Sequence, residues 1–178
     1  GGLHLDGLMD TFDGIFAGKK KRLKAMKDSK VGAFGVQSLV FITLIQIACI
    51  LKIQTHINIV LPICLFWGRF SNLFLIEKFQ YISYKKKSIS HKKFWKGFKK
   101  ESFISIAFLL IFIASQLVAI TSLTILVKFL LLIIIGTFLS YFIPKIMANK
   151  IGGFNGDICG ASVVLVETAM IFMYAILL

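Results

Sequence analysis

Long apolar stretches, separated by shorter polar segments, run through most of this sequence. Five of them are close to the roughly 20 residues that a helix needs to cross the hydrocarbon core of a bilayer. They cover residues 33–53, 57–76, 103–120, 123–142 and 158–178. The pattern predicts an all-α fold: a polytopic helical membrane protein with about five transmembrane helices. A short acidic helix precedes them at the N-terminus, on the cytoplasmic side.

The composition agrees with a membrane protein. Hydrophobic residues make up 57% of the 178 positions, above the usual share of about half in soluble domains. We expect a single integral-membrane domain over residues 1–178, with an active segment at 1–30 and transmembrane helices and cytoplasmic loops at 31–178. The chain opens with Gly1 rather than methionine and carries no signal-peptide pattern, so we also expect an upstream portion.

The net charge of +13 is unevenly placed. Most lysines and arginines fall in the segments 19–30, 78–100 and 145–150, which five consecutive crossings put on one side of the membrane. The positive-inside rule assigns that side to the cytoplasm. The charge is thereby explained without a specific nucleic-acid partner. The chain is expected in the cytoplasmic (inner) membrane, in contact with the lipid bilayer and with its active site on the cytoplasmic face.

An acidic cluster stands out in this basic chain. Asp6, Asp10 and Asp13 are spaced i, i+4 and i+7, so a helix places them on one face. Like charges so close repel one another unless a cation neutralises them. Carboxylate oxygens are ligands that Mg²⁺ prefers, with Asp28 or Asp157 as a further acid, and His4 is a candidate base or orienting group.

Two charged residues lie inside predicted spans. Arg69 and Glu167 would each be costly in hydrocarbon, so each is expected to be paired or functional. They are candidate partners for each other, and Arg69 facing an internal polar cavity is the other interpretation.

A glycine-rich segment precedes the last span. Gly153 and Gly156 leave backbone N–H groups open to phosphate, and Asp157 either binds metal or caps the helix. With Lys30 as a further phosphate contact, the residues favour metal-dependent phosphoryl or phosphodiester transfer at the membrane face. A cation transporter fits less well, because transport sites lie near the bilayer midplane.

Three blocks then resemble one family. Residues 2–14 (GLHLDGLMDTFDG), 26–35 (MKDSKVGAFG) and 152–161 (GGFNGDICGA) look like the signature blocks of the adenosylcobinamide-GDP ribazoletransferase family, in order and along the whole chain. Many members carry an acidic residue where this chain has Val164.

The resemblance implies a Mg²⁺-dependent reaction. Adenosylcobinamide-GDP and α-ribazole, or its 5′-phosphate, would join to give adenosylcobalamin or its phosphate, with release of GMP. The candidate catalytic residues are Asp10, Asp13 and His4. The candidate metal ligands are Asp6, Asp10, Asp13 and Asp157. The candidate ligand-binding residues are Asp28, Lys30, Arg69, Gly153, Gly156, Asp157 and Glu167.

Two alternatives stay open at this point. A phospholipid synthase similar to the CDP-alcohol phosphotransferases also uses an Asp-rich helix. That family has an alanine-arginine pair after the first glycine, whereas Gly14 is followed here by Ile15-Phe16-Ala17-Gly18. A membrane transporter for a cation or a corrinoid is the other alternative. The sequence does not indicate an oligomeric state.

Overall fold

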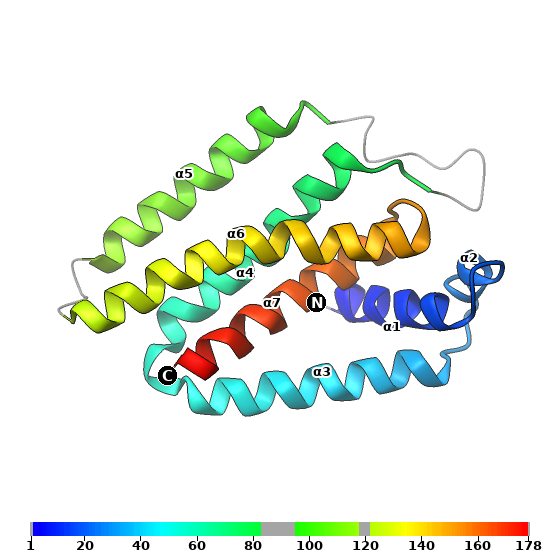
Figure 1. Ribbon diagram of the computed structural model, residues 1–178, viewed down its shortest axis with the longest axis horizontal. Helices are drawn as coiled ribbons and strands as arrows, with labels where there is room; N and C mark the ends of the chain where they lie inside the picture. The colour runs from blue at the N-terminus through cyan, green and yellow to red at the C-terminus, as the bar shows by residue number, and fades with distance from the viewer. Residues whose placement is uncertain (1, 83–94, 118–121, 178) are drawn as a thin grey trace.

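The computed structural model describes residues 2–82, 95–117 and 122–177, and these are almost entirely helical (Figure 1). The elements are α1 (Gly2–Phe16), α2 (Arg22–Ala25), α3 (Ala33–Lys52), the 3₁₀ turn η1 (Gln54–His56), α4 (Ile57–Lys78), α5 (Phe98–Leu117), α6 (Leu123–Ile151) and α7 (Gly156–Leu177). Within the described residues the β-type pairing is confined to one bridge, between Tyr81 and Phe154. The predicted all-α membrane fold is confirmed.

Helix α7 forms the centre of the bundle. It packs against α1, α3, α4 and α6, while α5 lies outside and packs against α4 (Figure 1). Small and medium apolar side chains make this central position possible: Val163, Val166 and Met170 are fully buried on α7, and so is Tyr174 near its end. Burial of this surface sets the position of the first turn of α7, which carries Asp157.

Four described helices are long and apolar enough to cross a membrane: α3, the η1–α4 segment (Gln54–Lys78), α6 and α7. They correspond to four of the five predicted spans. The fifth, at 103–120, begins within α5 and ends in residues that the structure does not describe, so the count of five stays a prediction. Helix α6 continues past the expected end at residue 142 to Ile151. It ends at Gly152, whose φ of 101° is left-handed, where the N–H groups of Gly152 and Gly153 both donate to the Ala148 carbonyl.

Helix α1 is longer than the positions of its glycines suggest. Gly14 and Gly18 predict a turn between them, but α1 runs through Gly14 to Phe16. Gly14 is buried in van der Waals contact with Met26, so its role is close packing. The turn comes later, at Gly18, whose φ is +80°.

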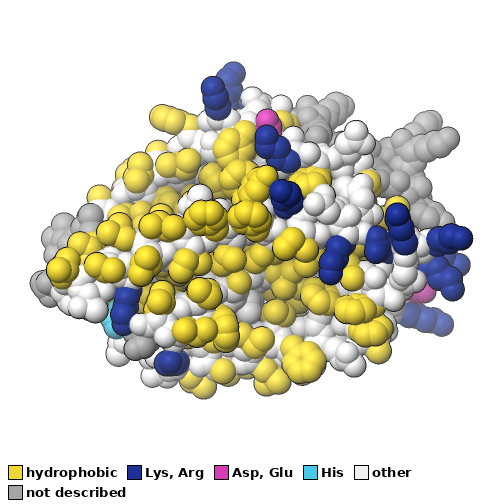
Figure 2. All heavy atoms as spheres, in the orientation of Figure 1, with side chains coloured by type: hydrophobic (Ala, Val, Ile, Leu, Met, Phe, Trp, Pro, Cys, Tyr) yellow, Lys and Arg dark blue, Asp and Glu magenta, His cyan; other side chains and the backbone are white. Residues whose placement is uncertain are grey.

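Three connections gather at one end of the bundle. The α1–α3 link, the end of α4 and the α6–α7 link all lie at the right of Figure 1, and Figure 2 shows Lys and Arg side chains concentrated over the same end. This supports the prediction that the basic segments share one side. We expect the lysine-rich loop at 78–102 to be an interfacial segment. Residues 83–94 of this loop lie outside the described residues, and α5 begins near its end, at Phe98.

Candidate functional site

Three segments that are far apart in the sequence meet at the basic end. Helix α1, the link from α2 to α3 and the first turns of α7 pack together, and glycines make the contacts close. A Cβ on Gly7 would lie 2.7 Å from the backbone oxygen of Asp157, and one on Gly160 would lie 3.1 Å from the His4 Cα. The structure therefore joins the three sequence blocks in one place.

This packing brings four carboxylates together. The side of α1 formed by Gly7, Leu8, Thr11 and Gly14 is buried, while Asp6, Asp10 and Asp13 lie on a neighbouring side. Burial and, after it, the negative charges of Asp157, Asp6 and Asp13 raise the pKa of Asp10 to about 6. The carboxylates of α1 and Asp157 of α7 therefore lie close enough for their charges to interact.

Asp157 is oriented by its neighbour rather than capping the helix itself. Asn155 Nδ2 donates to Asp157 Oδ2 at 2.8 Å, and Asn155 Oδ1 accepts the N–H of Ile158 at 3.0 Å. Asn155 therefore caps α7, in the position where asparagine is favoured. Of the two interpretations of Asp157, capping is excluded, and its carboxylate is left beside the acids of α1.

Asp13 makes a different set of contacts. Its Oδ2 accepts the N–H of Gly32 at 2.7 Å, and its Oδ1 accepts the N–H of Gly35 at 2.8 Å. Both donors belong to the N-terminal end of α3. The carboxylate thus connects the acidic helix to the second sequence block.

The donor chemistry suits a hard divalent cation, because carboxylate oxygens dominate the cluster. The repulsion between these carboxylates, which adds to the effect of burial in raising the pKa of Asp10, is also what a bound cation would relieve. Among the described residues no three His, Cys, Asp or Glu side chains are arranged as a ready-made metal site. The cluster would complete its coordination with water and substrate oxygens, as Mg²⁺ commonly does.

Asp28 and Lys30 are not among the charges that shift the pKa of Asp10. Both are exposed in the link before α3, where the Lys30 N–H donates to Asp28 Oδ1 at 3.1 Å. Of the two acids predicted to join the cluster, Asp157 does so. Asp28 does not contribute to the raised pKa of Asp10.

The two charges inside the spans form an ion pair. Arg69 Nη1 of α4 contacts Glu167 Oε1 of α7, and Glu167 is only 13% exposed. A Cβ on Gly68 would lie 2.6 Å from the Glu167 Cγ, so the glycine admits the carboxylate between the helices. The predicted pairing is confirmed. Arg69 also lines a pocket of about 470 Å³ that α4 shares with α5.

His4 precedes the acids on α1 and lies next to Gly160 of α7. Burial and, secondarily, the positive charge of Arg69 lower its pKa. His4 is therefore neutral at neutral pH, the form that accepts a proton. Val164, where an acid is common in the family that the sequence resembles, is buried with Leu8 and Ala161 and joins α7 to α1 through apolar contact.

Tyr81 and Asn155, which the sequence did not single out, lie beside Asp157. A pocket of about 170 Å³ lies there, lined by Leu23, Met26, Lys27, Tyr81, Ile82, Asn155, Gly156 and Asp157. Tyr81 reaches it because its strand-like segment pairs with the glycine-rich link: the Ile82 N–H donates to the Phe154 carbonyl at 2.8 Å, and the Phe154 N–H donates to the Gln80 carbonyl at 2.9 Å. A Cβ on Gly153 would lie 2.6 Å from that Gln80 oxygen. Gly153 thus serves this backbone pairing, while Gly156 lines the pocket.

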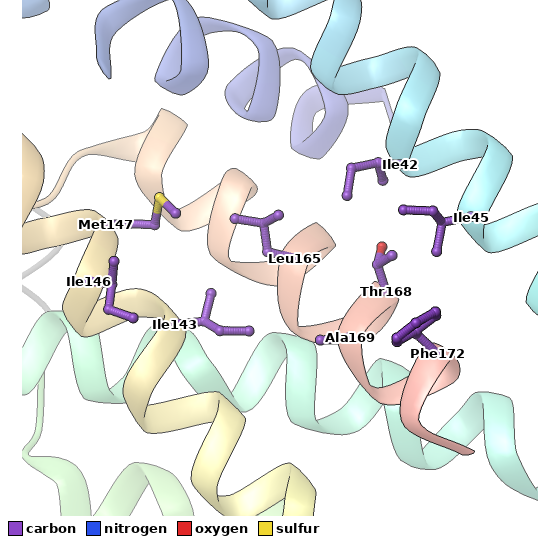
Figure 3. Close-up of a pocket in the computed structure, with 9 residues that line it drawn as sticks. All are labelled: Ile42, Ile45, Ile143, Ile146, Met147, Leu165, Thr168, Ala169 and Phe172. Carbon is purple, nitrogen blue, oxygen red and sulfur yellow. The ribbon is translucent and has the colours of Figure 1, made fainter. Parts of the chain in front are cut away.

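A second hollow lies away from the carboxylates. Figure 3 shows it between α3, α6 and α7. Its volume is about 340 Å³, and it is lined by Ile42, Ile45, Ile143, Ile146, Met147, Leu165, Thr168, Ala169 and Phe172. No lining side chain is ionisable, so this hollow offers no group for acid, base or metal chemistry.

Known proteins match the whole chain. The profile of the cobalamin-5-phosphate synthase family matches residues 1–175. An adenosylcobinamide-GDP ribazoletransferase of Prochlorococcus marinus is 43% identical, covering 100% of this chain and 69% of the relative. The corresponding protein of Trichormus variabilis is 33% identical over 99% of this chain and 69% of its own length. No solved structure matches. The family match and these identities, together with the convergence of the three blocks, show that the chain belongs to the cobalamin-5-phosphate synthase family.

Proposed function

We propose that this chain is a membrane transferase that completes the nucleotide loop of cobalamin. A hydroxyl of α-ribazole, or of its 5′-phosphate, attacks the cobinamide-side phosphorus of adenosylcobinamide-GDP. A new P–O bond forms, the P–O bond to GMP breaks, and the hydroxyl proton passes to a base in the site. The names of the relatives and the family match support this reaction.

One observation supports it most strongly: the approach of Gly7 to the Asp157 backbone, which brings the acids of α1 beside α7. We assign Mg²⁺ to the carboxylates of Asp6, Asp10, Asp13 and Asp157. When bound, the ion supplies charge neutralisation at the diphosphate. His4, neutral at neutral pH, is the protein group best suited to take the hydroxyl proton.

The polar pocket beside Asp157 suits part of the substrate. Lys27 offers a cation, and the first turn of α7 offers backbone N–H groups at Gly156. Tyr81 adds an aromatic face to the same wall. We place this end of the bundle on the cytoplasmic side of the inner membrane, because the basic segments gather there.

The alternatives are less well supported. A phospholipid synthase or a transporter would not account for a family match over residues 1–175 to cobalamin-5-phosphate synthases.

The test is GMP release by the purified protein in lipid vesicles with Mg²⁺, adenosylcobinamide-GDP and α-ribazole phosphate. Wild type should release GMP, and Asp10→Asn should lose this activity while keeping its helical circular dichroism. CDP-diacylglycerol with an alcohol serves as the alternative substrate pair. Turnover of that pair in place of the corrinoid, or normal turnover by Asp10→Asn, would refute the proposal.

A further inference from the structure

The N-terminal end of α3 has no side chain of its own to cap it. Its N-cap residue is Gly32, and the first backbone N–H groups of any helix lack partners within the helix. Asp13 supplies the missing acceptors from α1: each of its two oxygens takes one N–H, from Gly32 at 2.7 Å and from Gly35 at 2.8 Å. A carboxylate held at both oxygens has a fixed plane, and each oxygen keeps a second lone pair for another partner.

The same two glycines make room for that carboxylate. A Cβ on Gly35 would lie 2.5 Å from Asp13 Oδ2 and 3.1 Å from the Met9 carbonyl oxygen, and a Cβ on Gly32 would overlap Asp13 Oδ1. Neither glycine has a positive φ, so backbone conformation does not require glycine here. Glycine is required at both positions because a Cβ would enter the space occupied by the Asp13 carboxylate.

We propose that Gly32 and Gly35 are positioning residues for the Asp13 carboxylate, through their N–H groups and through the absence of a Cβ. This rests on the proposed function, in which Asp13 belongs to the Mg²⁺-binding cluster. Mutation of groups that hydrogen-bond to a metal ligand, without touching the metal, commonly changes the metal affinity 10- to 100-fold. Gly32 and Gly35 therefore tune the cluster without touching the metal or the substrate.

The test measures Mn²⁺ binding by electron paramagnetic resonance in the purified protein, without substrate. Mn²⁺ accepts the same oxygen ligands as Mg²⁺. Gly35→Ala should weaken Mn²⁺ binding about 10- to 100-fold. Gly2→Ala is the matched control, because Gly2 is also helical and its Cβ would meet nothing within 4 Å. Alanine favours both helices, so a loss confined to Gly35→Ala reflects the crowding of Asp13.

A double variant separates positioning from general destabilisation. In an Asp13→Asn background, Gly35→Ala should change Mn²⁺ affinity less than threefold or so, because the carboxylate that it displaces is already gone. A second readout is amide hydrogen exchange: Asp13→Asn should speed exchange at Gly32 and Gly35 by about tenfold or more. This readout remains decisive even if Gly35→Ala does not fold.

The outcomes are distinct. Wild-type affinity in Gly35→Ala, or unchanged amide exchange in Asp13→Asn, would overturn the positioning role while leaving the transferase intact. Absence of Mn²⁺ binding in wild type would overturn the metal assignment itself and, with it, this inference. Loss of Mn²⁺ affinity in Gly35→Ala but not in Gly2→Ala supports both the metal assignment and the positioning role of Gly35.

Discussion

The ion pair between α4 and α7 should respond unequally to the loss of its two members. Glu167 is 13% exposed, whereas Arg69 is 49% exposed and lines the pocket between α4 and α5. Arg69→Met leaves a carboxylate enclosed by packed helices without its cation. Glu167→Met leaves a guanidinium that still has open space and still reaches the Leu65 carbonyl at 3.3 Å.

The exposed fractions of Arg69 and Glu167 determine how much stability each variant is expected to lose. Leaving a buried charge without its partner costs about 3 kcal/mol or more, so we expect this for Arg69→Met. For Glu167→Met the loss is discounted to about 1 kcal/mol, because half of the remaining Arg69 side chain is exposed. The double variant removes both charges and should be more stable than Arg69→Met alone, since apolar replacement of a buried pair is often neutral.

The assay is reversible unfolding of the purified protein in mixed micelles of increasing denaturing-detergent fraction, followed by circular dichroism. Lys52→Met serves as the control, because this lysine is exposed at the end of α3. It should change the free energy of unfolding by no more than about 0.5 kcal/mol. Equal losses for Arg69→Met and Glu167→Met, or a double variant that is the least stable of all, would show that the burial of Glu167 does not set the cost of losing its partner.

The remaining predictions concern the acidic cluster and its packing. In metal-free protein the folded-state pKa of Asp10, about 6, exceeds its usual value of 3.8, so between these pH values the folded state binds more protons than the unfolded state. Stability should therefore fall by about 1 kcal/mol, after discounting for solvent, as pH rises through this window. Asp10→Asn should reduce that dependence in unfolding titrations, and a flat wild-type profile would contradict the prediction. Gly7→Ala should destabilise by about 1–3 kcal/mol and reduce turnover, because its Cβ would press on the Asp157 oxygen. Gly160→Ala should destabilise the protein less in the same thermal and turnover measurements, because its Cβ would lie 3.1 Å from the His4 Cα. A larger loss for Gly160→Ala than for Gly7→Ala would contradict this packing of α1 against α7.

The sequence predicted those features that depend on local periodicity or on burial cost. Four apolar stretches became helices long enough to span a membrane, and the i, i+4, i+7 spacing put the acids of α1 on one side. The cost of charge in hydrocarbon pointed to a partner for Arg69 and Glu167, and they pair.

What the sequence could not predict depends on contacts between distant segments. Tyr81 reaches the site only because its backbone pairs with the link before α7. Asp28 was as good a candidate for the cluster as Asp157, and only the packing of α7 on α1 distinguishes them. Gly14 suggested a turn because glycine favours turns and close packing alike, and periodicity alone does not separate the two.

We expect the carboxylates that α1 and α7 bring together to support transfer from a nucleotide-activated corrinoid. Its most direct measurement is the stoichiometry of product formation by the purified protein in lipid vesicles with Mg²⁺. We expect one GMP to be released for each corrinoid product that gains labelled α-ribazole phosphate, and neither product to form in Asp10→Asn. GMP release without transfer of the label, or transfer that persists undiminished in Asp10→Asn, would contradict this expectation.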